Sequence, residues 1–205
     1  MSRIDDDSKR KTISDECLQD VKKFIILDVR AGFLNEQQIE EDIEYYLQYT
    51  WPYEPEVEKG AFQELVHELY EQYTNKGDSV YYKKLEQAFE RLNRMGIVAE
   101  HLAGESMDEG FYNATEIAKE RYEEGEDIIG VCFYTNRSLI YLLEGITPVL
   151  YLSYGNCFKE PTAMEIGWMI VRELQQAGLE VKWNGQPEKK IGIYNLVWDK
   201  KYEKK

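Results

Sequence analysis

The chain has 205 residues, of which 43% are hydrophobic and 31% are charged, and its formal net charge is −14. This length is enough for one large domain or two small ones with a sizeable core. The charge excludes nucleic acid and anionic lipid as partners, because proteins bind both through clustered Lys and Arg. It favours a basic protein partner, or it simply keeps the protein in solution.

The sequence carries no signal for a membrane or for secretion. It has no run of roughly 18 apolar residues, so no membrane span is predicted. The first residues, MSRIDDDSKRKTIS, lack the apolar core of a signal peptide. The cysteines Cys17, Cys132 and Cys157 are an odd number at wide spacings, which fits neither a disulfide framework nor a zinc motif. We therefore expect free thiols in a protein of the reducing cytoplasm.

Residues 14–95 are predicted to be entirely helical. Ser14 and Gly32 suit the two ends of a first helix, and Asn35 begins the capping-box pattern of a second. Apolar residues at steps of three and four predict two more helices before Gly96. The joints are short, so we expect antiparallel helix packing.

From Gly96 the pattern changes to strands that alternate with helices. The expected strands cover 96–102, 127–135, 148–155 and 179–183, with a last strand from 191, and the expected helices cover 113–124, 136–144 and 162–177. Two of these helices begin with capping-box pairs, Asn113 with Glu116 and Thr162 with Glu165. The last two strands form a hairpin, and its loop is too long for a two-residue turn.

The order of these elements is β-α-β-(short α)-β-α-β-β. With the short helix counted as a connection, it matches a ferredoxin-like α/β sandwich with an added C-terminal strand. The predicted class is α+β, an N-terminal helical region followed by this sandwich. The expected organisation is a flexible tail at 1–13, the helical region at 14–95, the ferredoxin-like domain at 96–199 and a flexible Lys-rich tail at 200–205. The two ends are expected to be flexible because they contain few apolar residues.

No common catalytic constellation is present. The chain lacks a phosphate-binding loop, a dinucleotide-binding glycine motif and a nucleophile elbow, so we predict neither a cofactor nor catalytic residues. The closest nucleophile pair is Cys132 with His101, both on predicted strands. Cys132 lies in an unbroken apolar strand, where a free cysteine usually packs as a small hydrophobic residue.

The stretch EHLAGESMDEGF contains four candidate metal ligands, Glu100, His101, Glu105 and Asp108. Calcium and magnesium prefer carboxylate oxygens of this kind. The alternative is a solvated acidic loop that follows a strand. The stretch supports one hypothesis, in which the protein is a metal- or small-ligand-dependent enzyme that uses loop 100–109.

The stretch from Asn35 to Glu58 holds eight acidic residues and no Lys or Arg. Its candidate partner-binding residues are Glu41, Glu44, Tyr45, Tyr49, Trp51 and Tyr53. Aromatic side chains often dominate binding energy, and a field of one sign steers a partner of opposite charge. The alternative is that the tyrosines cover the helix core and keep their hydroxyl groups in water.

This stretch supports the favoured hypothesis, a non-enzymatic cytoplasmic protein that binds a basic protein. Suitable partners would be a nuclease toxin or another nucleic-acid-binding enzyme, and the role would be that of an inhibitor, an immunity protein or a regulator.

The second half also resembles a known family. The blocks GIVAEHLAGESMDEGF, VLYLSYG, EIGWMIVRELQQAGLEVKWNG and KKI resemble, in order, those of a bacterial family known only as a domain of unknown function. Two features depart from that pattern: Glu109 separates Asp108 from Gly110, and Pro148 with Val149 replaces a glycine start of the third strand. The resemblance covers about Gly96 to Ile193, with a helical region before it. It implies the architecture and no activity.

Overall fold

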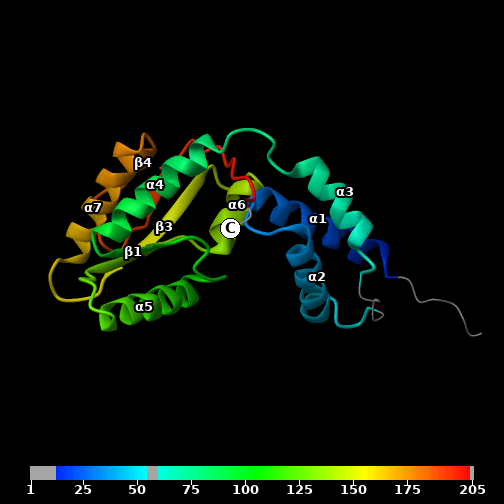
Figure 1. The fold of residues 1–205 in the computed structure, drawn as a ribbon, viewed down its shortest axis with the longest axis horizontal. Helices are drawn as coiled ribbons and strands as arrows, with labels where there is room; N and C mark the ends of the chain where they lie inside the picture. Colours follow the sequence, from blue (N-terminus) through cyan, green and yellow to red (C-terminus); the bar gives the residue numbers. More distant parts are fainter. Residues whose placement is uncertain (1–12, 55–59, 204–205) are drawn as a thin grey trace, which may run out of the picture. The chain divides into compact units, whose positions relative to one another are not determined.

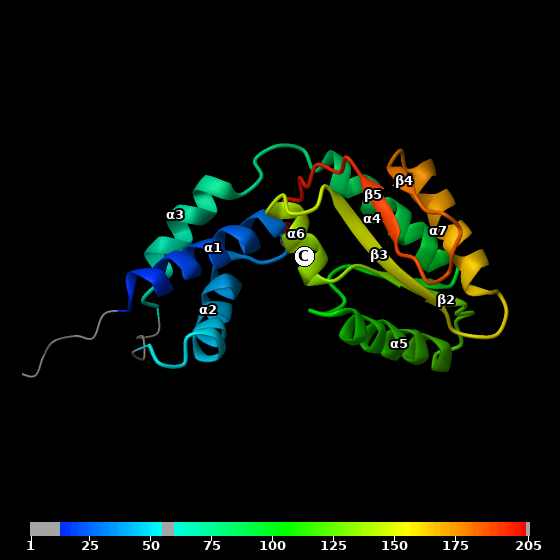
Figure 2. The same cartoon turned by 180° about the vertical axis from the view of Figure 1, so that it is seen from behind.

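A computed structural model describes residues 13–54 and 60–203 (Figures 1 and 2). The chain forms two compact units, Met1–Asn75 with Tyr202–Lys205, and Lys76–Lys201. The units divide after residue 75, whereas the sequence suggested a boundary after residue 95. The tail predicted at 1–13 lies outside the described residues except for its last position. None of the described helices is long and apolar enough to cross a membrane.

The first unit contains α1 (Asp15–Ala31), α2 (Glu36–Thr50) and α3 (Gln63–Tyr73). The local signals set the helix ends as predicted: the Ser14 side chain accepts a hydrogen bond from the Cys17 N–H. Gly32 ends α1 with a φ of 72°, a left-handed conformation that glycine adopts without strain. Asn35 and Gln38 form both hydrogen bonds of a capping box at the start of α2.

Each of these three helices buries one apolar stripe, and the stripes meet in a common core. The core residues are Cys17, Val21, Ile25, Val29, Ile39, Ile43, Phe62, Val66 and Leu69. No strand occurs among the described residues up to Asn75, which agrees with the predicted helical region.

The second unit consists of four helices and a five-stranded sheet. The helices are α4 (Val80–Arg94), α5 (Met107–Glu123), α6 (Asn136–Leu143) and α7 (Ala163–Gln176). The strands are β1 (Ile97–Glu100), β2 (Gly130–Phe133), β3 (Val149–Asn156), β4 (Glu180–Lys182) and β5 (Ile191–Tyr194). Helices α4 and α7 pack against each other on one side of the sheet, and α5 lies on the opposite side (Figures 1 and 2).

Helix α4 belongs with the sheet because its apolar stripe packs there. Its buried residues, Tyr82, Leu85, Ala88, Phe89 and Leu92, lie on one helix face, and α4 contacts both β1 and α7. Arg91 on α4 donates from Nε to Glu173 Oε2 on α7 over 2.8 Å, and this ion pair links the two helices. The sequence grouped α4 with the preceding helices because periodicity does not indicate what a buried face will contact.

Helix α5 approaches the sheet closely through a glycine. A Cβ atom on Gly110 would lie 2.3 Å from Cε2 of Phe133, so only glycine allows this packing distance. The helix begins at Met107, six residues before the predicted start. Its cap is Ser106, whose Oγ accepts a hydrogen bond from the Glu109 N–H. Asn113, the predicted cap, instead donates to the Ala103 carbonyl oxygen.

The predicted α+β class, with helices first and the sheet second, is confirmed. The strand order is β1-β2-β3-β5-β4, and β1 pairs with β2 in parallel. A ferredoxin-like fold is built from split β-α-β units, in which another strand lies between the two parallel strands. Here only β3-α7-β4 is split, by β5, whereas β1-α5-β2 pairs directly. The added C-terminal strand therefore lies inside the sheet and leaves β4 at the edge.

The last hairpin and the chain end are held by specific contacts. In the wide loop between β4 and β5, Trp183 Nε1 donates to the carbonyl oxygens of Gln186 and Lys189. The end from Lys200 was predicted to be a flexible tail, but the Lys201 N–H donates to Ser79 Oγ over 3.0 Å. In the first unit, Tyr202 Oη accepts a hydrogen bond from Asn35 Nδ2. These two hydrogen bonds involve Lys201 and Tyr202, and residues 204–205 of the predicted tail lie outside the described part of the chain.

Candidate functional site

Helix α2 presents a row of polar and aromatic side chains at steps of four residues: Gln37, Glu41, Tyr45 and Tyr49. Residues at this spacing lie on one face of a helix. Gln37 Nε2 donates to Glu41 Oε1 over 3.0 Å, and the rings of Tyr45 and Tyr49 lie 4.3 Å apart. Each of these two tyrosines is 65% exposed, so the helix offers an aromatic pair that the unit's own core does not use.

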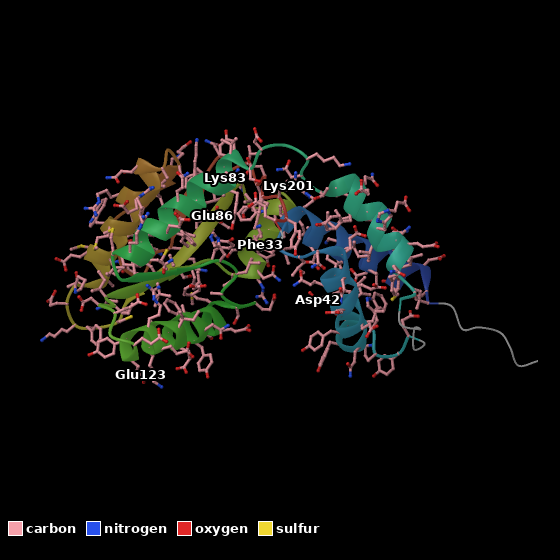
Figure 3. All side chains as sticks on the ribbon, in the orientation of Figure 1. Phe33, Asp42, Lys83, Glu86, Glu123 and Lys201 are labelled. Atoms are coloured by element: carbon pink, nitrogen blue, oxygen red, sulfur yellow. The ribbon has the colours of Figure 1, made fainter. Side chains whose placement is uncertain are left out.

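This row lies in the most acidic part of the chain. Residues 13–75 contain 15 acidic and 4 basic residues, a formal charge of −11 out of the total of −14. Asp42 is exposed on α2 (Figure 3), where partial burial and the neighbouring carboxylate of Glu41 raise its pKa. Burial is the larger cause of this raised pKa, and the repulsion from Glu41 adds to it; a cationic partner would relieve the repulsion.

Five of the six predicted partner-binding residues are exposed, namely Glu41, Glu44, Tyr45, Tyr49 and Tyr53. We call these five side chains the α2 face. Tyr53, just beyond the helix, is fully exposed. The structure places them on one helix and the turn after it, as the hypothesis requires.

Trp51, the sixth residue, instead holds the first unit together. It is half-buried against the core, and its Nε1 donates to Asp20 Oδ2 over 2.9 Å. Tyr46 donates to the same oxygen over 2.5 Å, and its ring stacks on Phe24. Burial and the hydrogen bond to Asp20 raise the pKa of Tyr46. One carboxylate oxygen of Asp20 on α1 therefore holds both Tyr46 and Trp51.

The structure does not bring the four predicted metal ligands together. His101 lies among aromatic rings: its Nδ1 is 2.9 Å from the Tyr134 hydroxyl oxygen, and its ring stacks on Phe89 at 4.6 Å. Glu100 is half-buried, and burial raises its pKa although the charge of Arg121 acts in the opposite direction.

The other two predicted ligands have different surroundings. Glu105 accepts a hydrogen bond from Asn136 Nδ2 over 2.7 Å, and Asp108 is exposed in the first turn of α5. Within the described ranges, no group of three or more His, Cys, Asp or Glu side chains could hold a metal ion.

Cys132 is completely buried, and this burial raises the pKa of its thiol. A thiol without access to substrate does not act as a nucleophile. All three cysteines are free, and only Cys157 is exposed. The packing of Cys132 thus agrees with its predicted role as a small hydrophobic residue.

A cavity of about 370 Å³ lies where β1 and β2 end, and the sequence did not indicate it. Its wall contains two cations, Arg137 and Lys190, from segments more than 50 residues apart. Hydroxyl groups of Ser106, Thr135 and Ser138 line it together with the predicted residue Glu105. The rest of the wall is formed by Met107, Tyr141, Thr147 and Tyr151. In open sheets, small ligands bind beyond the carboxyl ends of parallel strands, which is where this cavity lies.

No curated protein and no solved structure matches the chain. A family model matches residues 14–202, which include α1 through β5. This match confirms the resemblance seen in the second half and extends it over the first unit. The chain belongs to the family described as a domain of unknown function (DUF6891).

Proposed function

We propose that the protein is a non-enzymatic acidic protein of the cytoplasm that binds a basic protein partner and thereby inhibits or regulates it. The observation that carries this proposal is the exposed tyrosine pair of α2, set in a segment of high negative charge. Tyrosine suits such a contact because it offers a large rigid surface at low entropic cost. Acidic groups around it would steer a basic partner toward the face.

A cavity in the same unit supports this choice of partner chemistry. It has a volume of about 330 Å³ and is lined by Glu16, Gln19, Asp20, Lys23 and Trp51. The two carboxylates and the indole ring attract a guanidinium or ammonium ion, and the two carboxylates outnumber the one cation of the wall, Lys23. An Arg or Lys side chain of the partner is the group that we expect to enter it.

Affinity capture from the source organism tests the proposal with matched baits. The wild-type protein is compared with the double variant Glu41→Lys/Glu44→Lys, which changes the charge of the α2 face. The control is Glu116→Lys/Glu123→Lys, which makes the same change in net charge on α5. Both control residues are exposed, and Glu123 points away from the sheet (Figure 3).

We expect the wild-type protein and the α5 variant to capture the same basic protein, and the α2 variant to lose it. A second pair separates aromatic contact from charge: Tyr45→Ala/Tyr49→Ala should weaken capture, whereas Tyr112→Ala, a similarly exposed tyrosine on α5, should not. If both charge variants lost the captured protein equally, net charge alone would explain the binding, and the proposal of a specific binding face would be refuted.

A second candidate function is binding of a small anion in the cavity between Arg137 and Lys190. The observation that favours it is the presence of two basic side chains in one cavity of an acidic protein. Inorganic phosphate and simple carboxylates should then raise the melting temperature by mass action. The variant Arg137→Ala/Lys190→Ala should abolish this shift. A response to divalent cations alone would instead favour a metal-dependent activity.

A further inference from the structure

A second cavity of the sheet-containing unit has a different character. It has a volume of about 430 Å³ and lies between one flank of α5 and the strands β2 and β3. This volume is within the usual range for small-ligand sites, roughly 300–1,000 Å³. The cavity includes no residue of the α2 face and shares no lining residue with the cavity near Arg137.

The inner wall of this cavity is apolar and rigid. It is formed by Phe111, Ala118, Ile128 and Val131. Phe111 is fixed edge-to-face against the completely buried Phe133, with ring centroids 4.9 Å apart. Gly155 lines the cavity on the β3 side. A wall of packed rings and small residues favours an apolar ligand body.

The mouth of the cavity combines aromatic rings with a single charge. Tyr122 and Phe158 are 56% and 46% exposed, and the centroids of their rings lie 5.4 Å apart. Lys119 is the one charged residue among those that line the cavity. The apolar interior and the ammonium group at its edge therefore match a molecule with a hydrocarbon body and one anionic end.

We propose that this cavity is a binding site for a small amphiphile, a medium-chain carboxylate whose hydrocarbon chain lies between α5 and the sheet and whose carboxylate contacts Lys119. The chain makes the main contribution, because burial of apolar area drives binding. The lysine selects an anionic end over a neutral one, since an ion pair at a partly apolar edge is less screened than one in water.

The protein contains its own reporter for this site. Cys157 lines the cavity and is exposed, whereas Cys17 and Cys132 are buried. The rate at which a thiol reagent labels the folded protein therefore measures access to this cavity. Decanoate, used below its micelle concentration, is the probe, and decan-1-ol is the uncharged probe of equal chain length.

We expect decanoate to slow the labelling of Cys157. At about ten times its Kd the rate should fall about tenfold, because mass action leaves about one molecule in eleven unoccupied. Affinity should rise about fourfold for each methylene from hexanoate to decanoate, as expected from apolar burial. The labelling stoichiometry must stay at one thiol, which shows that the protein remains folded while the probe is present.

Three variants test whether the protection of Cys157 comes from binding in this cavity. Thr115→Trp, at an exposed lining position, should fill the cavity and abolish the protection. Glu116→Trp, at the next exposed position and outside the cavity, is its control and should behave as wild type. Lys119→Gln should weaken decanoate binding several-fold and leave decan-1-ol unchanged.

Several results would overturn the proposal. One is a rate of Cys157 labelling in the wild-type protein that decanoate does not change. Another is equal protection of Thr115→Trp and wild type by decanoate. A chain-length series without a trend would exclude the apolar contact. If Lys119→Gln bound both probes as wild type does, the assignment of the anionic end would be wrong. None of these readouts depends on the α2 face, so they leave the partner-binding proposal untouched.

Discussion

The five aromatic residues of α2 and the turn after it divide into two groups according to what they contact. Tyr45, Tyr49 and Tyr53 are exposed, whereas Trp51 and Tyr46 both donate hydrogen bonds to Asp20. Substitution in the first group should affect binding, and substitution in the second should affect folding. Trp51 also lines the cavity proposed for a partner side chain, so its loss should affect that cavity as well. This separation lets the binding proposal be tested with variants that keep the protein intact.

Trp51→Ala should lower the free energy of unfolding by about 2 kcal/mol, because it removes ring packing and one hydrogen bond. Trp51→Phe keeps most of the packing and should cost only about 1 kcal/mol. Tyr53→Ala, at a fully exposed position, should stay within about 0.5 kcal/mol of wild type. Urea unfolding followed by the loss of helical circular dichroism measures all three. If Trp51→Ala were as stable as wild type, Trp51 would have no structural role and would count only as a candidate binding residue.

The cysteines should react in an order set by their burial. Cys157 should be labelled in the folded protein, whereas Cys17 and Cys132 should react only after denaturant is added. Burial also raises the pKa of the Cys132 thiol, so little thiolate is present at neutral pH. Thiol titration with and without denaturant, with the labelled peptides identified by mass spectrometry, gives the order. Rapid labelling of Cys132 in the folded state would revive a catalytic role for it.

At the scale of elements, the pairing of α4 with α7 depends on one buried carboxylate. Glu173 is only 5% exposed, and it accepts hydrogen bonds from Arg91 at 2.8 Å and Arg172 at 3.2 Å. Arg91 also donates from Nη2 to the Glu173 carbonyl oxygen, so it satisfies a backbone group near the end of α7 as well. This pair adds a polar link between α4 and α7 to the apolar packing that places α4 with the sheet.

Arg91→Ala should destabilise the protein by about 3 kcal/mol, because it leaves a buried charge with only its weaker partner. Arg172→Ala is the control: its guanidinium is mostly exposed, and its loss should cost less than about 1 kcal/mol. Urea unfolding at neutral pH measures both. Equal costs for the two variants would show that Arg91 has no special structural role.

The same pair predicts a dependence of stability on pH. Burial acts to raise the pKa of Glu173, but the hydrogen bonds from Arg91 and Arg172 outweigh it and hold this pKa below its ordinary value of 4.5. A lowered pKa adds stability above pH 4.5, and this stability is lost as the pH falls through the folded-state pKa. Unfolding measured from neutral pH to below 4.5 should show this loss in wild type. It should be much reduced in Glu173→Gln, which cannot ionise.

At the scale of the whole molecule, charge is distributed unevenly along the chain. Residues 13–75 account for −11 of the net −14, so the first unit is the source of most of the negative field. Such a field acts at a distance and is screened over roughly 8 Å near physiological ionic strength. It should therefore govern how fast a basic partner arrives, whereas the tyrosines govern how long it stays.

Once a partner has been captured, association and dissociation kinetics at low and high salt test these separate roles of charge and tyrosines. Glu41→Lys/Glu44→Lys should slow association by about tenfold at low salt and by much less at high salt. Tyr45→Ala/Tyr49→Ala should mainly speed dissociation, with a loss on the order of 2 kcal/mol or more for a good anchor. A charge variant whose effect is the same at both salt concentrations would contradict steering.

The sequence by itself determined the features that depend on neighbouring residues. The helix ends at Ser14, Asn35 and Thr162 were predictable because a capping side chain bonds a backbone N–H three residues away. The buried stripes of the helices and the apolar strand around Cys132 followed from periodicity for the same reason. The acidic face of α2 was also readable, since charge and helical spacing are local properties.

Tertiary structure decided everything that depends on contacts between distant segments. The place of β5 between β3 and β4, the grouping of α4 with α7 and the structural role of Trp51 each require a partner far away in the chain. Both cavities of the second unit are also of this kind, because Arg137 and Lys190, or Lys119 and Cys157, become neighbours only when the sheet forms. Periodicity shows which face of an element is buried, but the packing of the whole unit selects what that face contacts.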